Sequence, residues 1–202
     1  PSKSGDIKAL CSALRSKDLG EIGKALYNRF EDACPEDRVE EAEENVHYLL
    51  DSVALTKFLF WMKKNVGKKQ MDEYSVAMKL DQMRSEVEDF LDVSFPTISA
   101  YKENAAMMHY SATPESNAQL KPEGFLLVDS GGHYYEGSTD ITRTIALGEL
   151  TEEQKRVYTL VLKGHIKLQM LKFPYGASGT QLDAVARMDM WSEGMNFMHG
   201  TG

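Results

Sequence analysis

Two short apolar segments on either side of a turn-rich stretch constrain the fold of this chain more than any other feature of its sequence. Residues 125–128 have the composition of a buried strand, and residues 141–147 alternate as a second strand does. Residues 130–138, which are rich in glycine and tyrosine, connect the two segments. The pattern therefore predicts a β-hairpin.

Two aspartates stand at the ends of these strands, Asp129 after the first and Asp140 before the second. With a turn centred between Tyr134 and Tyr135, they become direct cross-strand neighbours whose Cβ atoms lie roughly 4.5–5.5 Å apart. Two ionised carboxylates that close repel each other, so they either share a proton or bind a metal ion. The alternative is structural, with Asp129 as a turn former and Asp140 as an edge residue paired with Arg143. The spacing alone does not choose between these interpretations.

The composition narrows the class of protein. The chain has 202 residues, of which 42% are hydrophobic and 27% charged, and this excludes a disordered tail, a collagen-like fibre and a disulfide scaffold. Its net charge of −8 argues against a nucleic-acid partner. The apolar runs are too short to span a membrane. Cys11 and Cys34 have no metal-like or redox-like partner nearby in the sequence, which favours reduced thiols and a cytoplasmic location.

The rest of the chain reads mostly as helix. Apolar spacing and capping residues predict helices over residues 5–15, 20–30, 46–67, 72–91, 151–171 and 180–193, and a short strand over 105–110. The acidic segment 31–44 is interpreted as a solvated helix start. The predicted class is therefore α+β, with helices first and a sheet with packed helices after them.

Several motifs together resemble a known family. The segment Leu-Leu-Val-Asp-Ser-Gly-Gly-His-Tyr-Tyr-Glu-Gly-Ser-Thr-Asp-Ile-Thr-Arg-Thr at 126–144 resembles the signature of the metal-dependent aminopeptidase P and prolidase family, peptidase family M24. The similarity extends to residues 92–99, to His109-Tyr110, to 158–165 and to His-Gly-Thr-Gly at 199–202. The branch resembled is the long, cytosolic Xaa-Pro aminopeptidase. The resemblance implies that residues 45–202 are the N-terminal portion of a pita-bread (creatinase/aminopeptidase) catalytic domain, and that residues 1–44 are a helical linker or the tail of a preceding domain.

The resemblance also implies a dinuclear metal site with two Asp, one His and two Glu ligands. Asp129 and Asp140 match the two aspartate ligands, and Mn²⁺ is the expected metal, with Zn²⁺ or Co²⁺ as alternatives. His109 and His199 match family histidines that face the substrate. In the family, a metal-activated water attacks the carbonyl of the Xaa-Pro bond.

The function implied is removal of the N-terminal residue ahead of proline from peptides, by a cytoplasmic homodimer. Of the five ligands only Asp129 and Asp140 match, and the chain stops within a His-Gly-x-Gly-His motif, so we expect a fragment that is inactive on its own and from which the metals can be absent. Two alternatives remain: prolidase, which acts on Xaa-Pro dipeptides, and a non-catalytic pita-bread module that binds peptides.

Overall fold

The structure, a computed structural model, describes residues 39–135 and 137–201, and the chain divides into two compact units, residues 1–147 and 148–202. The helices predicted over 5–15 and 20–30, most of the acidic segment and both cysteines lie outside the described residues. Helix α3 (Val39–Asn65) runs across residue 44, after which the sequence predicts the start of the catalytic domain. That domain boundary stays a prediction.

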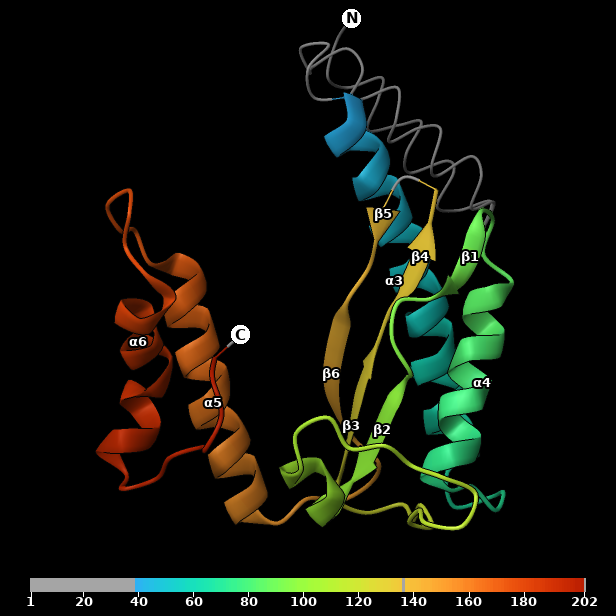
Figure 1. Cartoon of the computed structure of the whole chain (residues 1–202). Coiled ribbons are helices and arrows are strands. Elements are labelled where there is room, and N and C mark those ends of the chain that lie inside the picture. The colour runs from blue at the N-terminus through green and yellow to red at the C-terminus, as the bar shows by residue number, and fades with distance from the viewer. Residues whose placement is uncertain (1–38, 136, 202) are drawn as a thin grey trace, which may run out of the picture. The chain divides into compact units, whose positions relative to one another are not determined.

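Within the described residues, the first unit contains two antiparallel sheets of three strands each. One sheet has the order β2-β3-β6, formed by Ile98–Tyr101, Phe125–Ser130 and Ile141–Ala146. The other has the order β1-β4-β5, formed by Phe90–Val93, Gly132–Tyr134 and Gly137–Ser138. The chain from β3 to β6 is one long hairpin whose two arms pass from the first sheet into the second (Figure 1).

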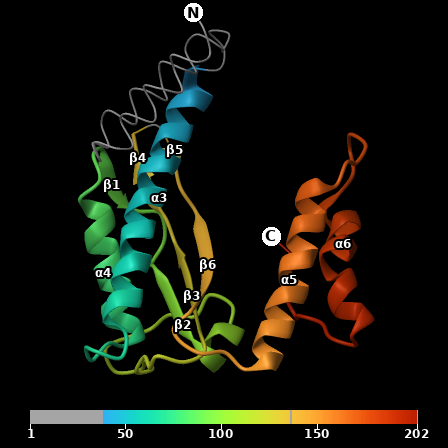
Figure 2. The same ribbon diagram turned by 180° about the vertical axis from the view of Figure 1, so that it is seen from behind.

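Helices α3 and α4 (Glu73–Ser85) cover one side of this hairpin, as the view from behind shows (Figure 2). Strand β3 alternates strictly, with Leu126, Val128 and Ser130 buried. The first two belong to a core shared with both helices, which also includes Leu55, Phe58, Met62, Val76, Leu80 and Ile141. Since neighbouring strand residues point to opposite faces, Asp129 lies on the face away from the helices. Helices and antiparallel strands in one chain confirm the predicted α+β class.

Two predicted elements were wrong. The helix predicted over 72–91 ends at Ser85, and residues 90–93 form strand β1 instead. Asp89 adopts a left-handed conformation (φ 61°) in the turn that leads from the end of the helix to this strand. Phe90 then packs edge-on against Tyr134, with the ring centroids 6.0 Å apart. Pairing with a distant strand thus replaces the helix that local apolar spacing favours.

The strand predicted over 105–110 is also absent. A 3₁₀ helix, η2 (Lys102–Ala106), occupies part of this segment, and a turn follows it in which His109 has a φ of 56°. The carboxylate of Glu73 accepts hydrogen bonds from the backbone N–H of Tyr101, before this segment, and of Ala118, after it. Holding both ends at one carboxylate favours a compact turn over an extended strand.

The second unit is a pair of helices, α5 (Glu152–Met170) and α6 (Gly179–Ser192), close to the predicted bounds. The capping box predicted at the start of α5 is present, because Thr151 Oγ1 accepts from Gln154 N at 3.1 Å and Gln154 Oε1 accepts from Thr151 N at 3.0 Å. Gly164 is buried where α5 meets α6.

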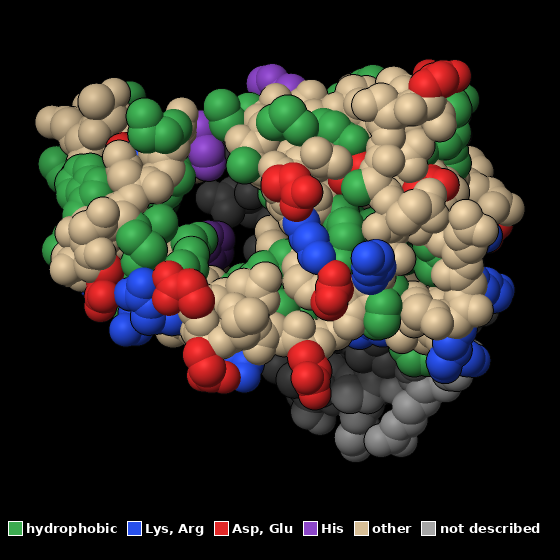
Figure 3. Space-filling view, turned by 90° about the horizontal axis from the view of Figure 1, so that it is seen from below, with side chains coloured by type: hydrophobic (Ala, Val, Ile, Leu, Met, Phe, Trp, Pro, Cys, Tyr) green, Lys and Arg blue, Asp and Glu red, His purple; other side chains and the backbone are tan. Residues whose placement is uncertain are grey.

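Among the described residues, no helix is both long and apolar enough to cross a bilayer. On the face seen in Figure 3, Lys and Arg side chains are interspersed with Asp and Glu side chains and form no continuous basic surface. Among the described residues, Lys102 and Glu123 form an exposed ion pair whose charged atoms are 2.6 Å apart.

Candidate metal centre

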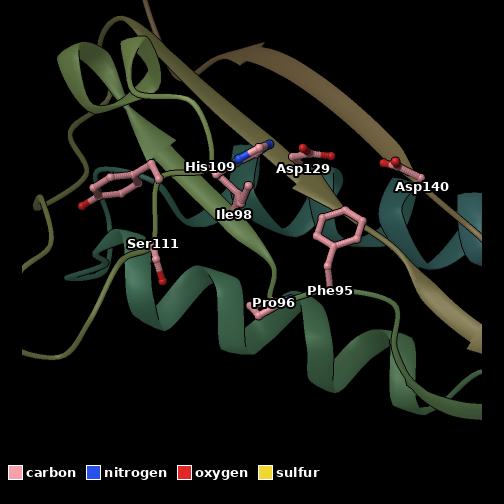
Figure 4. Close-up of a pocket in the computed structure, with 8 residues that line it drawn as sticks. Phe95, Pro96, Ile98, His109, Ser111, Asp129 and Asp140 are labelled. Carbon is pink, nitrogen blue, oxygen red and sulfur yellow. The ribbon is translucent and has the colours of Figure 1, made fainter. Parts of the chain in front are cut away.

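A pocket of about 380 Å³ in the first unit contains three of the four residues that the sequence singled out. Asp129 comes from β3, Asp140 from the residue before β6, and His109 from the turn after η2. Figure 4 shows both carboxylates and the imidazole along the same side of the β3–β6 ribbon. The remaining lining residues are Phe95, Pro96, Ile98, Tyr110 and Ser111. The pocket therefore combines acidic groups with an apolar wall.

The predicted register of the hairpin is wrong by one residue at its turn. Tyr134 pairs with Gly137, so the chain reverses one residue later than predicted. Asp129 is consequently opposite Thr142 rather than Asp140. Moving the centre of a hairpin by one residue moves each cross-strand partner by two, which leaves the two aspartates on the same face as diagonal neighbours.

The two carboxylates still interact. Partial burial, the negative charge of Asp129 and a hydrogen bond with it raise the pKa of Asp140. The hydroxyl of Thr142 donates to Oδ1 of Asp129 at 2.6 Å, which orients that carboxylate. None of the residues that line the pocket is a Lys or Arg, so no such side chain of the lining offsets the repulsion between the two carboxylates. A cation bound there would do so.

Carboxylate oxygens are the ligands that hard divalent cations such as Mn²⁺ prefer. No group of three or more His, Cys, Asp or Glu side chains with suitable geometry occurs within residues 47–135 and 137–201. Asp129 and Asp140 thus fit one part of a divalent metal site, and the described residues do not supply a whole coordination sphere.

The position of His109 depends on a buried acid that the sequence did not reveal. Glu73 is completely buried, and its carboxylate accepts from Tyr101 N at 2.6 Å, Tyr110 OH at 2.7 Å and Ala118 N at 2.7 Å. Burial, together with the charge of Glu73, raises the pKa of Tyr110 to about 12, so this phenol remains a donor at physiological pH. The segment that carries His109 is therefore tied to the start of α4. An acid in the first turn of a helix is ordinary, and no local signal marks Glu73 as such an anchor.

His199, the fourth predicted residue, lies in the second unit after α6. Its Nδ1 is 2.7 Å from the carbonyl oxygen of Gly200, and its ring packs on Phe197. Arg187 organises this segment, because its guanidinium donates to the carbonyl oxygens of Phe197 at 2.6 Å and His199 at 2.5 Å. An ion pair with Asp183 at 2.6 Å fixes the guanidinium in turn. Arg187 was not identified from the sequence either.

The comparisons with known proteins agree with the resemblance. Residues 48–202 match the sequence model of metallopeptidase family M24. A probable Xaa-Pro aminopeptidase P of Sclerotinia sclerotiorum is 45% identical over 157 residues, covering 77% of this chain and 26% of that protein. Xaa-Pro aminopeptidase 2 of Homo sapiens is 44% identical over 163 residues, covering 81% of this chain and 24% of that protein. The chain thus spans about a quarter of the length of these curated relatives.

The solved structures give the same result. An X-prolyl aminopeptidase from Caenorhabditis elegans, described as a cytosolic enzyme with a di-nuclear active site, superposes with a TM-score of 0.76 at 39% sequence identity. The match covers 81% of this chain and 27% of that one. An Escherichia coli aminopeptidase P variant shares the fold, with a TM-score of 0.63 at 23% identity over 76% of this chain and 33% of that one. The helices and strands of this chain are part of the predicted pita-bread fold, and the chain belongs to metallopeptidase family M24.

Proposed function

We propose that the full-length protein is a metal-dependent Xaa-Pro aminopeptidase that releases the N-terminal residue ahead of proline from peptides. The observation that carries the proposal is the pocket in which Asp129, Asp140 and His109 come together beside an apolar wall. Relatives named Xaa-Pro aminopeptidase at 44–45% identity support the reaction, and the di-nuclear site of the Caenorhabditis elegans enzyme supports two metal ions.

In this proposal Asp129 and Asp140 are two of the metal ligands, and the Thr142 hydroxyl keeps the Asp129 carboxylate oriented. When bound, the cations would lower the pKa of the attacking water and polarise the scissile carbonyl. His109 stands at the edge of the same pocket, where an imidazole N–H donates to the substrate carbonyl as negative charge develops on it. Phe95 and Ile98 shield one side of the pocket from water. His199 is assigned to the substrate side by its motif.

Three finer features are part of the proposal. Oxygen-rich ligands favour Mn²⁺ over softer metals, with Zn²⁺ and Co²⁺ as alternatives. The cytosolic Caenorhabditis elegans relative supports a cytoplasmic location. A homodimer remains a prediction without a supporting contact.

The 202-residue chain by itself is expected to be inactive even with excess Mn²⁺, because its described residues contribute two carboxylates and no group of three ligands.

The test uses the full-length protein, stripped of metal with a chelator and assayed for release of the first residue from an Xaa-Pro-Yaa tripeptide. We expect no turnover without metal, recovery with Mn²⁺, and loss of turnover in Asp129→Asn and Asp140→Asn. Asp92→Asn, which changes an exposed aspartate of β1 outside the pocket, serves as the matched control and should retain activity.

Three outcomes would contradict the proposal. Turnover that persists after complete metal removal would exclude a metallopeptidase. A preference for Xaa-Pro dipeptides over longer peptides would indicate prolidase. Absence of bound metal by elemental analysis, together with no rescue by Mn²⁺, would indicate a non-catalytic peptide-binding module. Prolidase is disfavoured, because the curated relatives at 44–45% identity are named Xaa-Pro aminopeptidase.

A further inference from the structure

A fully buried ion pair lies on the helix side of the hairpin that carries the two aspartates. Arg84 of α4 and Asp51 of α3 each have an exposed side-chain fraction of 0%. Arg84 Nε donates to Asp51 Oδ1, and Nη2 donates to Asp51 Oδ2 at 3.3 Å. Removing two charges from water is costly unless further hydrogen bonds compensate. The other contacts of the pair therefore indicate its role.

One of those contacts comes from the Tyr134 hydroxyl, which donates to Asp51 Oδ1 at 3.0 Å, and the others go to residues adjacent to the two proposed ligands. Arg84 Nη2 donates to Oγ of Ser130 at 3.1 Å, and Ser130 directly follows Asp129. The hydroxyl of Thr139, which directly precedes Asp140, donates to Asp51 Oδ2 at 2.9 Å. Since alternate residues of a strand face opposite sides, these hydroxyls point toward the helices.

The pair also lies where the hairpin bends from one sheet into the other. Regular pairing of β3 with β6 ends at Ser130 and Ile141, and pairing of β4 with β5 begins at His133 and Ser138. At the bend, a Cβ on Gly131 would lie 1.9 Å from the carbonyl oxygen of Thr139, so only glycine fits there.

The Thr139 hydroxyl acts as a relay at this bend. It accepts from Gly132 N at 2.9 Å while it donates to Asp51, and it thereby connects both arms of the hairpin to the buried pair. Asp129 lies on one side of the bend and Asp140 within it. The separation of the two carboxylates consequently depends on how the bend is held.

We propose that Asp51 and Arg84 are positioning residues, which fix the separation of the Asp129 and Asp140 carboxylates through the hydroxyls of Ser130 and Thr139. The inference rests on the proposed function, because it takes the two aspartates to be metal ligands. It adds to that function a polar support placed on the side of the hairpin opposite the pocket, contributed by two helices that do not line the pocket.

The test removes the two connecting hydroxyls and leaves the ion pair itself in place. Ser130→Ala and Thr139→Val are made in the full-length protein, and binding of Mn²⁺ is measured by calorimetry and the geometry of the site by the visible absorption spectrum of bound Co²⁺. Each change is expected to weaken Mn²⁺ binding about tenfold, as loss of partners behind metal ligands does. The Co²⁺ spectrum is expected to shift in both variants. Thr139→Ser keeps the hydroxyl and should restore most of the affinity.

Ser99→Ala provides the matched control. Ser99 is a buried serine of β2 whose hydroxyl has no hydrogen-bond partner among the described residues, so its loss should leave Mn²⁺ affinity and the Co²⁺ spectrum unchanged. Thermal unfolding of the metal-free variants shows whether each remains folded. Mn²⁺ affinities within twofold of the parent in folded Ser130→Ala and Thr139→Val would overturn this inference alone. A parent protein that binds neither Mn²⁺ nor Co²⁺ would overturn the proposed function and the inference with it.

Discussion

The side-chain hydroxyl of Thr142 donates a 2.6 Å hydrogen bond to Oδ1 of Asp129, the residue directly opposite it in the β3–β6 ladder. This bond fixes the orientation of the carboxylate through a neighbour on its own sheet face. A carboxylate so oriented loses less rotational freedom when it binds a cation. Thr142 therefore contributes to the candidate metal centre without being a ligand itself.

Replacement of Thr142 by valine tests this relationship. Thr142→Val keeps the β-branched shape but removes the donor, and we expect Mn²⁺ affinity to fall about tenfold while the metal-free melting temperature stays within about 1 °C. Calorimetric titration and thermal unfolding measure the two quantities. Thr142→Ser retains the hydroxyl and should bind Mn²⁺ nearly as the parent does. Equal affinity of the valine and serine variants would show that the hydrogen bond has no influence.

A second prediction concerns the repulsion between the proposed ligands. In the metal-free protein at neutral pH, Asp140→Asn removes one of two neighbouring negative charges. The melting temperature of this variant should therefore lie between that of the parent and about 2 °C above it. Saturating Mn²⁺ should raise the melting temperature of the parent and not that of the variant, because only the parent binds the metal. A variant that is destabilised without metal, or stabilised by metal as the parent is, would contradict the assignment of Asp140.

The buried carboxylate of Glu73 makes a third prediction possible. In Glu73→Gln an amide replaces an acceptor that two backbone N–H groups and the Tyr110 hydroxyl use, so some of these donors lose their partner. We expect the free energy of unfolding to fall by about 1–3 kcal/mol. Hydrogen exchange at the amides of Tyr101 and Ala118 should accelerate, and mass spectrometry of the corresponding peptides measures this.

The matched control for Glu73 is Glu123→Gln. Glu123 is about half exposed and forms a 2.6 Å pair with Lys102, and surface pairs of this kind contribute little to the free energy of unfolding because solvent screens them. Unfolding in urea should therefore separate the two variants. A Glu73→Gln protein as stable as Glu123→Gln would exclude Glu73 as the anchor of the segment that carries His109.

Features that depend on neighbours along the chain could be predicted from the sequence. The strands flanking residues 130–138 and the capping box at Thr151 rest on local patterns, and both are present. The proximity of Asp129 and Asp140 was expected from the hairpin itself, whereas the place of His109 beside them was expected only from the resemblance to known motifs.

Features set by distant contacts could not be predicted. Strand β1 forms by pairing with the distant strand β4, and the apolar spacing of residues 72–91 predicted a helix there instead. Glu73 and Asp51 look like ordinary helix acids, yet their partners lie 28–45 and 33–88 residues away in the sequence. A buried charge is recognisable only once the fold brings its partners to it.

The last prediction concerns the packing of the second unit. A Cβ on Gly164 would lie 2.0 Å from the backbone oxygen of Ala186, so Gly164→Ala must push α5 away from α6. We expect a loss of about 1–3 kcal/mol in the free energy of unfolding, measured by urea denaturation. Gly179→Ala at the start of α6 is the matched control, because nothing lies within 4 Å of the place its methyl group would take and alanine favours the helix. Equal stability of the two variants would mean that the helices separate without cost, and that close contact at Gly164 does not hold this unit together.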